Sequence, residues 1–501
     1  MYRKWSILVA ILLVFVWVGP AFSQGPKHCT GIYIGKNLTQ DGSVLLGQNG
    51  DENSSHWVEI IPAKRHDDNA TLSVGVGPEA NYPGKITEIP QAKRTNKYIT
   101  VRYTEYKGFS PPLENGGLNE HRVSIVDVWS PSRKELADMT PKGQTGLSYS
   151  DEAKVAMERA KSAREAVEII GQMVEQYGHA TYGGNTHLIA DPNEGWIIEQ
   201  FAGGKGLWAA KRLGPDDIYV TRPGWIGNFP LDYKQKSGFM GSDNLISFAE
   251  EQGWFDRQSG KNFNISEVYE MDRDTCWVGS GITPEEQPGH QSKSDLVVKA
   301  YEYFEGKKGS ITLQDVMNLL RSRPYSNPGT KYSQVAQLHS DLDADLNALW
   351  VAIGPPETSI FVPFFSGITT LPLEYQEHRY LTKGEAMRFS LPKERQGQET
   401  TLYAYRLYDR LYMLNDEHFD AFYPDLNSVL MAYQKQLLDK QAGTEAIGAT
   451  LIESGKHNLA QTYLTYYSST ESLQALEMIK SLANGLEART RALYGFRPLS
   501  K

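Results

Sequence analysis

One cysteine near the start of the chain is placed for nucleophilic chemistry. Cys29 follows a short polar stretch, which itself follows a long apolar run. If the chain is cut immediately before Cys29, that residue carries a free α-amino group as well as its thiol, so one residue supplies both a nucleophile and a general base. The two groups titrate at about 8.5 and about 8, which is close enough for proton transfer at neutral pH. This arrangement predicts attack of the Cys29 sulfur on a carbonyl carbon.

Two polar residues further along could assist such a nucleophile. Asp51 lies in the polar loop 48–53, where a carboxylate within hydrogen-bond reach of an α-ammonium would fix its orientation and raise its pKa. Asn119 lies in a glycine-rich turn, and an Asn side chain can donate to the oxyanion that forms when sulfur attacks an amide carbonyl. Ordinary turn capping is the alternative role for both residues.

The first 28 residues predict export and two cleavages. Residues 1–23 resemble a signal peptide, with a basic start, an apolar run and a small-x-small cleavage site. At about 1.5 Å per residue the apolar run reaches roughly 21 Å, short of the ~30 Å hydrocarbon core of a membrane. Cleavage after Ser23 leaves residues 24–28 as a short propeptide, so the nucleophile hypothesis needs a second cut. We therefore expect a periplasmic or secreted protein without a membrane anchor.

The two cysteines of the chain raise an alternative for Cys29. An exported protein with Cys29 and Cys276 could join them in a disulfide. A chain of 501 residues can bury enough surface to fold without such a bridge, which weakens this interpretation without removing it.

The net charge and the absence of several common motifs argue against some classes of partner and some kinds of catalytic site. The chain has 51 Lys and Arg against 60 Asp and Glu, a net charge of −9, which disfavours nucleic acid and anionic membranes as partners. It lacks a dinucleotide fingerprint, a phosphate-binding loop, a His-Glu-x-x-His and a Gly-x-Ser-x-Gly elbow. The acidic turn 191–195 is explained by hairpin chemistry, and no metal site is predicted. The oligomeric state is not specified, and a homo-oligomer is compatible with the sequence.

The predicted elements place Cys29 at the open end of a hairpin. Residues 30–36 and 43–46 predict two strands joined at Asp41-Gly42, which returns the loop after the second strand to Cys29. Further strands are predicted at 57–62, 97–103, 123–128, 186–190, 196–200, 207–211, 218–221, 349–353 and 359–365. Helices are predicted at 151–161, at 163–177 with a capping box from Ser162 to Glu165, and after Thr312, with a surface loop at 280–295.

Helical periodicity dominates the end of the chain. Apolar residues recur with helical spacing, for example at Leu426, Val429, Leu430, Tyr433 and Leu437. We expect a catalytic domain over residues 29–380 and a helical region over residues 381–501. Strands in two long groups, with helices between and after them, favour an α+β layered architecture over a parallel doubly wound sheet, which would need regular alternation.

A series of short motifs in a particular order resembles one known family. The motifs are Cys29-Thr30-Gly31, Asp41-Gly42-Ser43, Gly47-Gln48-Asn49-Gly50-Asp51, Gly117-Leu118-Asn119-Glu120-His121, Leu188-Ile189-Ala190-Asp191-Pro192 with Trp196 and Glu199, and Trp350 with Phe361-Val362-Pro363-Phe364. Together they are similar to the cysteine dipeptidases of the N-terminal-nucleophile (Ntn) hydrolase superfamily. These include the dipeptidase A type of lactic acid bacteria and, more distantly, the secernins; bile salt hydrolases and penicillin V acylases share the opening motifs. The resemblance runs over most of residues 29–370.

The resemblance implies a four-layer αββα sandwich and a cysteine nucleophile that is exposed by processing. Cys29 matches the nucleophile, Asp51 matches the carboxylate near its amino group, and Asn119 matches the oxyanion-hole asparagine. Cys276 matches no catalytic position. Neither a metal nor an organic cofactor is needed for this chemistry.

Two positions depart from the family pattern. The family usually has Arg where this chain has Gln48, and Asn where Arg222 aligns. A cation is therefore missing at one corner of the expected substrate site and present at another. We hypothesise that Arg222 supplies the charge that Gln48 cannot. Altered substrate choice and loss of activity are the alternatives.

Three functions follow, in decreasing order of support. The first is an exported cysteine-type dipeptidase that hydrolyses small peptide substrates through an acyl-enzyme. The second is an acylase that cleaves a non-peptide amide, such as an N-acyl amino acid or a conjugated bile acid. The third is a non-catalytic envelope binding protein in which Cys29 is disulfide-bonded.

Overall fold

The computed structural model of this chain describes residues 29–52, 54–104, 108–222, 226–270, 295–377 and 403–495. The predicted signal peptide, the propeptide 24–28, Cys276 and the loop 280–294 lie outside the described residues, as does the predicted boundary at residue 380. Residue 295 already begins a helix.

Cys29 directly precedes a strand of a six-stranded antiparallel sheet. In spatial order the strands are β15 (Ile218–Thr221), β1 (Thr30–Ile34), β2 (Val44–Gly50), β19 (Tyr332–Leu338), β20 (Ala348–Ile353) and β21 (Val362–Phe365). The predicted hairpin of β1 and β2 is confirmed. Residues 48–50, expected in a loop, instead extend β2, because they pair with β19 on one side and β1 on the other.

A second, nine-stranded sheet is also antiparallel throughout. Its order is β17 (Phe239–Gly241), β14 (Trp208–Leu213), β13 (Gly195–Gln200), β12 (Asn185–Ala190), β11 (Ser124–Trp129), β10 (Gly117–Asn119), β8 (Tyr98–Tyr103) and β3 (His56–Ile61), with β9 (Leu113–Glu114) beside β8. The meander predicted over residues 186–211 forms β12, β13 and β14. Three two-stranded ribbons complete the strands: β4 (Lys64–Arg65) with β7 (Arg94–Thr95), β5 (Thr71–Val74) with β6 (Thr87–Pro90), and β16 (Asn228–Phe229) with β18 (Phe263–Asn264).

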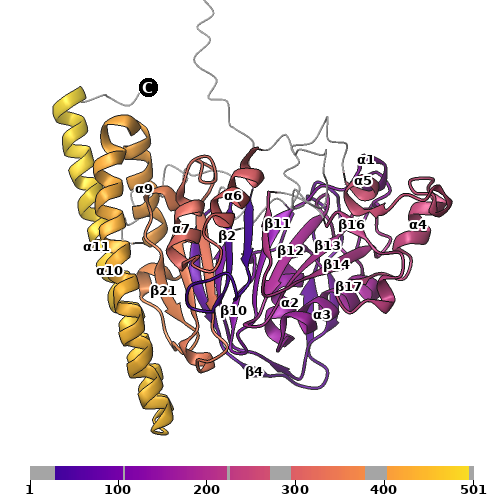
Figure 1. Cartoon of the computed structure of the whole chain (residues 1–501), viewed down its shortest axis with the longest axis horizontal. Coiled ribbons are helices and arrows are strands. Elements are labelled where there is room, and N and C mark those ends of the chain that lie inside the picture. Colours follow the sequence, from indigo (N-terminus) through magenta and orange to yellow (C-terminus); the bar gives the residue numbers. More distant parts are fainter. Residues whose placement is uncertain are drawn as a thin grey trace, which may run out of the picture.

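The two sheets face each other, and helices cover their outer faces (Figure 1). Strands β1 and β2 pack on β11 and β12, where alternating apolar residues such as Leu46, Leu188 and Val126 form a shared core. Helices α2 (Tyr149–Arg159) and α3 (Ala163–Tyr177) lie on the nine-stranded sheet, whereas α6 (Asp295–Glu305) and α7 (Leu313–Arg321) lie on the six-stranded one. The expected α+β fold with four αββα layers is therefore confirmed.

Helix starts follow local capping rules, with one correction. Ser148 with Asp151 and Thr312 with Asp315 form complete capping boxes at α2 and α7. At α3 the Ser162 hydroxyl accepts from the Glu165 N–H, but the Glu165 carboxylate accepts from the Lys161 N–H, so the predicted box is only half formed. Within the described part of the chain up to residue 270, the remaining α-helices are α1 (Lys134–Ala137), α4 (Leu245–Glu251) and α5 (Ile265–Tyr269).

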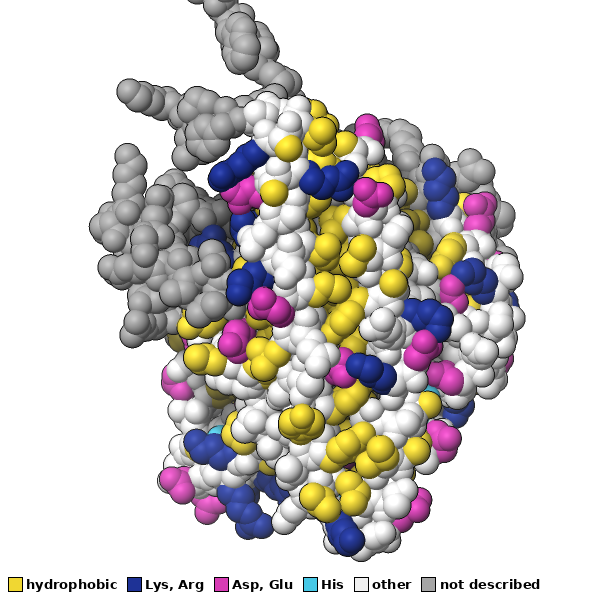
Figure 2. Space-filling model, turned by 90° about the vertical axis from the view of Figure 1, so that its left-hand side faces the viewer, with side chains coloured by type: hydrophobic (Ala, Val, Ile, Leu, Met, Phe, Trp, Pro, Cys, Tyr) yellow, Lys and Arg dark blue, Asp and Glu magenta, His cyan; other side chains and the backbone are white. Residues whose placement is uncertain are grey.

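Three helices described in the C-terminal part of the chain, within residues 403–495, extend the six-stranded side of the molecule. They are α9 (Ala404–Asp416), α10 (Phe419–Glu453) and α11 (His457–Tyr494), and α10 and α11 form the long pair at the left of Figure 1. Gln434 of α10 hydrogen-bonds the backbone N–H and C=O of Phe361 and accepts from Arg321, so α10 is tied to the sheet. Figure 2 shows apolar side chains along the outer face of this helical layer. No helix among the described residues combines the length and apolar character needed to cross a membrane.

Candidate functional site

Three strand ends meet at one end of the six-stranded sheet. Gly31 of β1 pairs with Thr221 of β15, and Thr30 pairs with Asn49 of β2. Because neighbouring strands are antiparallel, the start of β1 lies beside the ends of β15 and β2. The residues that continue from these ends are Cys29, Arg222 and Asp51. The register therefore brings together three predicted site residues that are far apart in the sequence.

The Cys29 side chain points between the two sheets. A methyl group placed on Gly31 would lie 2.8 Å from Leu188 Cδ1 and 3.3 Å from Val128 Cγ2, so this face of β1 is covered by the nine-stranded sheet. Side chains alternate along a strand, and Cys29 therefore shares this face with Gly31. Cys29 is partly buried and has no disulfide partner among the described residues.

The surroundings of Cys29 favour the protonated thiol. Burial raises its pKa well above the ordinary value, and the negative charges of Glu52, Asp51 and Asp127 raise it further. The backbone N–H of Asp51 opposes this effect by donating a hydrogen bond. A reaction at Cys29 therefore needs a base that removes the thiol proton and a cation that offsets the nearby carboxylates.

Asp51 is held rigidly at the corner where β2 ends. Its Oδ1 accepts from the Thr330 hydroxyl at 2.5 Å, and its Oδ2 accepts from Asn327 Nδ2 at 2.9 Å. Both partners precede β19, which pairs with β2. The side chain is thus fixed beside the residue whose amino group it was predicted to orient.

Arg222 provides a buried positive charge beside Cys29. Its Nη1 donates to the Thr30 hydroxyl at 3.2 Å and to the Pro324 carbonyl at 3.5 Å, and its guanidinium lies 5.5 Å from the centre of the Tyr325 ring. Arg222 is only 4% exposed. Burial lowers its pKa, while the charges of Asp51, Tyr325 and Cys29 act in the opposite direction. The predicted cation is therefore present at this corner.

Gln48 occupies the corner where the family usually has a cation. It is fully buried, and its Nε2 donates to the backbone carbonyl of Asp127 and, at 3.3 Å, to Asp127 Oδ1. Its Oε1 accepts from Gln334 Nε2 at 3.3 Å. Gln48 thus bridges the two sheets as a neutral donor. Burial, followed by the Glu52 charge, raises the pKa of Asp127 well above its usual range.

Among the described residues, the Asn119 side chain hydrogen-bonds backbone groups of its own turn and of the end of α2, and none of these partners belongs to the cluster around Cys29. Its Nδ2 donates to the carbonyls of Met157 at 3.1 Å and Ala160 at 2.8 Å, at the end of α2. Its Oδ1 accepts from the N–H groups of His121 at 2.9 Å and Val123 at 3.0 Å.

The sheet register separates Asn119 from Cys29. Asn119 pairs with Tyr98 at one end of β8, whereas Tyr103, which neighbours the acidic cluster, lies at the other end. At about 3.4 Å per residue these ends are roughly 17 Å apart. Asn119 therefore caps its own turn, which is the alternative role stated above.

Four residues that the motifs did not single out complete the site: Glu52, Asn115, Asp127 and Tyr332. Asn115 Nδ2 donates to Glu52 Oε1 at 2.9 Å and to the Tyr332 hydroxyl at 2.7 Å, while its Oδ1 accepts from the Tyr103 hydroxyl at 3.0 Å. Burial is the main cause that raises the pKa of Glu52 to about 7. Two local signals were available: Glu52 directly follows Asp51, and Asp127 is a charged residue between Val126 and Val128 in an apolar run.

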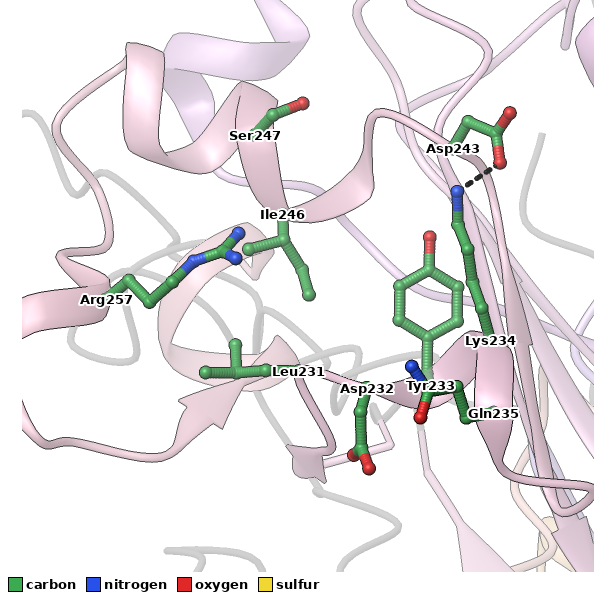
Figure 3. Close-up of a pocket in the computed structure, with 9 residues that line it drawn as sticks. All are labelled: Leu231, Asp232, Tyr233, Lys234, Gln235, Asp243, Ile246, Ser247 and Arg257. Atoms are coloured by element: carbon green, nitrogen blue, oxygen red, sulfur yellow. Dashed lines mark hydrogen bonds and ion pairs between the residues drawn. The ribbon is translucent and has the colours of Figure 1, made fainter.

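A separate surface pocket has no connection to this cluster. It has a volume of about 240 Å³ and lies on α4 and the turn before β17, where its lining residues are shown in Figure 3. The basic groups at its rim are already paired, Lys234 with Asp243 at 2.5 Å and Arg257 with Glu250 at 3.0 Å. None of its lining residues belongs to the Cys29 site.

Comparison with known sequences identifies relatives along most of the chain. The model of a family described as peptidase family C69 matches residues 28–277. A protein named probable dipeptidase B from Streptococcus pyogenes is 26% identical over 384 residues, which span 70% of this chain and 74% of that protein. A probable dipeptidase from Latilactobacillus sakei is 23% identical over 479 residues, spanning 87% of this chain and 92% of that protein.

Comparison with solved structures finds more distant likenesses. A mutant of conjugated bile acid hydrolase from Clostridium perfringens is 11% identical, with a TM-score of 0.32, and the match covers 65% of this chain and 89% of that one. A Caenorhabditis elegans ortholog of N-acylethanolamine-hydrolyzing acid amidase is 12% identical, with a TM-score of 0.28, covering 61% of this chain and 92% of that one.

Proposed function

Because the chain belongs to peptidase family C69, we propose that it is an exported dipeptidase that uses Cys29 as its nucleophile. The substrate class is supported by relatives named probable dipeptidases, which align with 70% and 87% of this chain. Export is proposed from the apolar start of the sequence, and removal of residues 24–28 would then free the Cys29 amino group.

One observation carries the proposal: Cys29 lies at a strand end with a fixed carboxylate and a buried cation beside it. Asp51 is oriented by Asn327 and Thr330, and Arg222 is oriented by Thr30. A carboxylate can hold an α-ammonium in place, and a cation can offset the carboxylates that disfavour charge on sulfur. A role limited to packing would not require a charged pair at the open end of β1.

The proposed reaction uses the two functional groups of the processed Cys29. The α-amine takes the thiol proton as sulfur attacks the carbonyl carbon of the first residue of the substrate. The tetrahedral oxyanion then collapses, the C–N bond breaks, and the amine passes the proton to the leaving nitrogen. Water, deprotonated by the same amine, cleaves the resulting thioester and releases the first residue. The high thiol pKa makes this built-in base necessary.

Arg222 replaces Asn119 as our candidate for stabilising the oxyanion. The Asn119 amide is occupied by Met157 and Ala160. The Arg222 charge, in contrast, interacts with Cys29 directly. A preorganised donor in a water-poor site is worth about 10²- to 10³-fold in rate.

The test compares two amides and one variant. Wild-type protein is assayed with L-alanyl-L-alanine and with N-propionyl-L-alanine, and Cys29→Ala is assayed with both. We expect hydrolysis of the dipeptide, reduced at least about 10³-fold in Cys29→Ala. Hydrolysis of N-propionyl-L-alanine alone would favour an acylase, and a wild-type protein that cleaves neither amide would contradict an enzymatic role of this kind.

A further inference from the structure

Two buried acceptors beside Cys29 lack a donor among the described residues. They are Oε2 of Glu52 and Nε2 of His56, which lie 3.9 Å apart. Glu52 follows β2, and His56 opens β3 in the opposite sheet. An unsatisfied buried acceptor costs free energy, so a ligand that donates to both atoms would be stabilised here.

His56 cannot itself donate to Glu52. Its Nδ1 lies 2.9 Å from the carbonyl oxygen of Ser54, which only accepts, so the ring proton is on Nδ1 and Nε2 carries a lone pair. Burial lowers the pKa of His56 to about 3, and the ring therefore remains neutral. With Glu52 ionised, as it would be beside a bound cation, the gap between the two atoms is lined by two acceptors and suits a group with several N–H donors.

Other contacts fix the two acceptors in place. The second oxygen of Glu52 accepts from Asn115, and the His56 ring lies 5.0 Å from the ring of Tyr332 and 5.4 Å from that of Tyr103, centre to centre. The His56 side chain has no exposure, whereas the Glu52 side chain keeps 19%. A ligand would therefore approach from the side of Glu52, against aromatic rings that favour a cation.

The pair lies next to the nucleophile. Glu52 is the first of the charges that act on Cys29. A side chain at Gly50 would collide with the Tyr332 ring and with Glu52 Oε2, so the glycine lets both groups approach the strand that ends beside Cys29. Asp51 and Asp127 are also close enough for their carboxyl groups to act on the thiol.

We propose that Glu52 and His56 bind the α-ammonium group of the substrate's first residue, so that the site selects peptides with a free N-terminus; this rests on the proposed dipeptidase function. In a dipeptide only one carbon atom separates this nitrogen from the carbonyl carbon that Cys29 attacks. An ammonium held by Glu52 and His56 therefore positions the carbonyl beside the sulfur. Two of its three N–H groups satisfy the two acceptors.

The substrates of the previous test also measure this selection, because they differ only in the α-ammonium group. We expect wild-type protein to prefer L-alanyl-L-alanine to N-propionyl-L-alanine in kcat/KM. Glu52→Gln should lower the ratio of kcat/KM for the dipeptide to kcat/KM for N-propionyl-L-alanine about 10- to 100-fold, as expected for loss of a charged hydrogen bond made only by the dipeptide. His56→Phe should act in the same direction. Glu302→Gln, at an exposed position of α6, should not change this ratio.

Failure of this inference differs from failure of the proposed function. A wild-type protein that cleaves both amides equally well is still a dipeptidase, but it has no ammonium site. Equal losses on both substrates in Glu52→Gln would indicate a structural role and would also overturn the inference. If wild type cleaves neither amide, calorimetric binding of both to wild type decides: preference for the dipeptide that Glu52→Gln abolishes supports the site, and equal binding contradicts it.

Discussion

Asn115 and Asn119 belong to one glycine-rich segment, yet their amides serve different parts of the molecule. Asn119 donates to two carbonyls at the end of α2 and accepts from two N–H groups of its own turn. Asn115 donates to Glu52 and Tyr332 beside the nucleophile. Every partner of Asn119 is a backbone group, whereas Asn115 contacts an ionisable carboxyl group and two tyrosines.

The difference separates a residue that stabilises the fold from one that shapes a reactive site. The side-chain amide of Asn119 is satisfied by backbone groups of its own turn and of the end of α2. Around Cys29, in contrast, Glu52 and Asp127 are buried with raised pKa values and Arg222 is buried as a cation. Clusters of perturbed titratable groups are typical of functional sites. Substitution of Asn119 should therefore affect mainly the stability of the protein, whereas substitutions around Cys29 should affect mainly turnover.

The largest effect is expected at Arg222. Arg222→Ala should lower kcat/KM by about 10²- to 10³-fold, because it removes the cation that offsets three carboxylates and faces the oxyanion. Arg222→Lys keeps the positive charge but loses the planar guanidinium, so its kcat/KM should lie between those of Arg222→Ala and wild type. Steady-state kinetics measure the loss, and the rate of Cys29 alkylation reports the thiolate separately. Undiminished turnover in Arg222→Ala would remove this residue from the mechanism.

Glu52→Gln should stabilise the protein in a pH-dependent manner. The Glu52 pKa rises from 4.5 to about 7 on folding, so the folded state holds the proton more tightly, and stability is lost as pH rises through this interval. Binding of this proton contributes on the order of 3 kcal/mol to the free energy of unfolding at low pH, and the contribution is fully lost above pH 7. Glutamine does not titrate, so the free energy of unfolding of Glu52→Gln should exceed that of wild type clearly at pH 8 and hardly at all at pH 4.5. Urea unfolding at both pH values measures it; a pH-independent difference would argue against a buried, titrating carboxyl.

Asn119→Ala should lower the free energy of unfolding by about 2 kcal/mol, because two hydrogen bonds to helix carbonyls are lost and two N–H groups lose their acceptor. Turnover should stay within about 3-fold of wild type at temperatures where the variant is folded. A large loss of kcat without loss of stability would restore the oxyanion role that the structure argues against.

Asn115→Ala, in contrast to Asn119→Ala, should lower turnover more than stability, and its effect should be the smallest of the four. Removing the donor to Glu52 and Tyr332 should loosen the carboxyl beside Cys29 and lower kcat/KM about 10-fold, the worth of one hydrogen bond to a charged group. Asn119→Ala, assayed in parallel, is the matched control from the same segment. If the two variants lose activity equally, the separation between the two regions does not hold.

Local pattern predicted much of the fold. Alternation and turn residues identified the β1–β2 hairpin and the β12–β14 meander, and the hairpin placed Asp51 near Cys29. The helix at 163–177 was predicted with its observed bounds, because a cap, an apolar stripe and a terminal glycine all agree there. Where polar residues continue a strand, as at Gln48, the pattern predicted a loop instead.

The candidate site was predictable only in part, since it is assembled across two sheets. Arg222 was expected from its alignment with a strand-end motif, and the register of β15 with β1 explains its position. Asp127 reaches the site because β11 packs under β2, which no spacing within the sequence reveals. The choice between Asn115 and Asn119 depends on the direction of each side chain, which a shared glycine-rich turn does not fix.

The central claim is that Cys29 becomes an N-terminal nucleophile, and the N-terminus of the active protein tests it most directly. N-terminal sequencing and intact-mass measurement of purified, active wild-type protein should identify a chain that begins at Cys29, and Cys29→Ala should show whether the cut depends on the thiol. An active protein whose chain begins at Gln24 would contradict the claim, because the Cys29 nitrogen would then be an amide and could not accept the thiol proton.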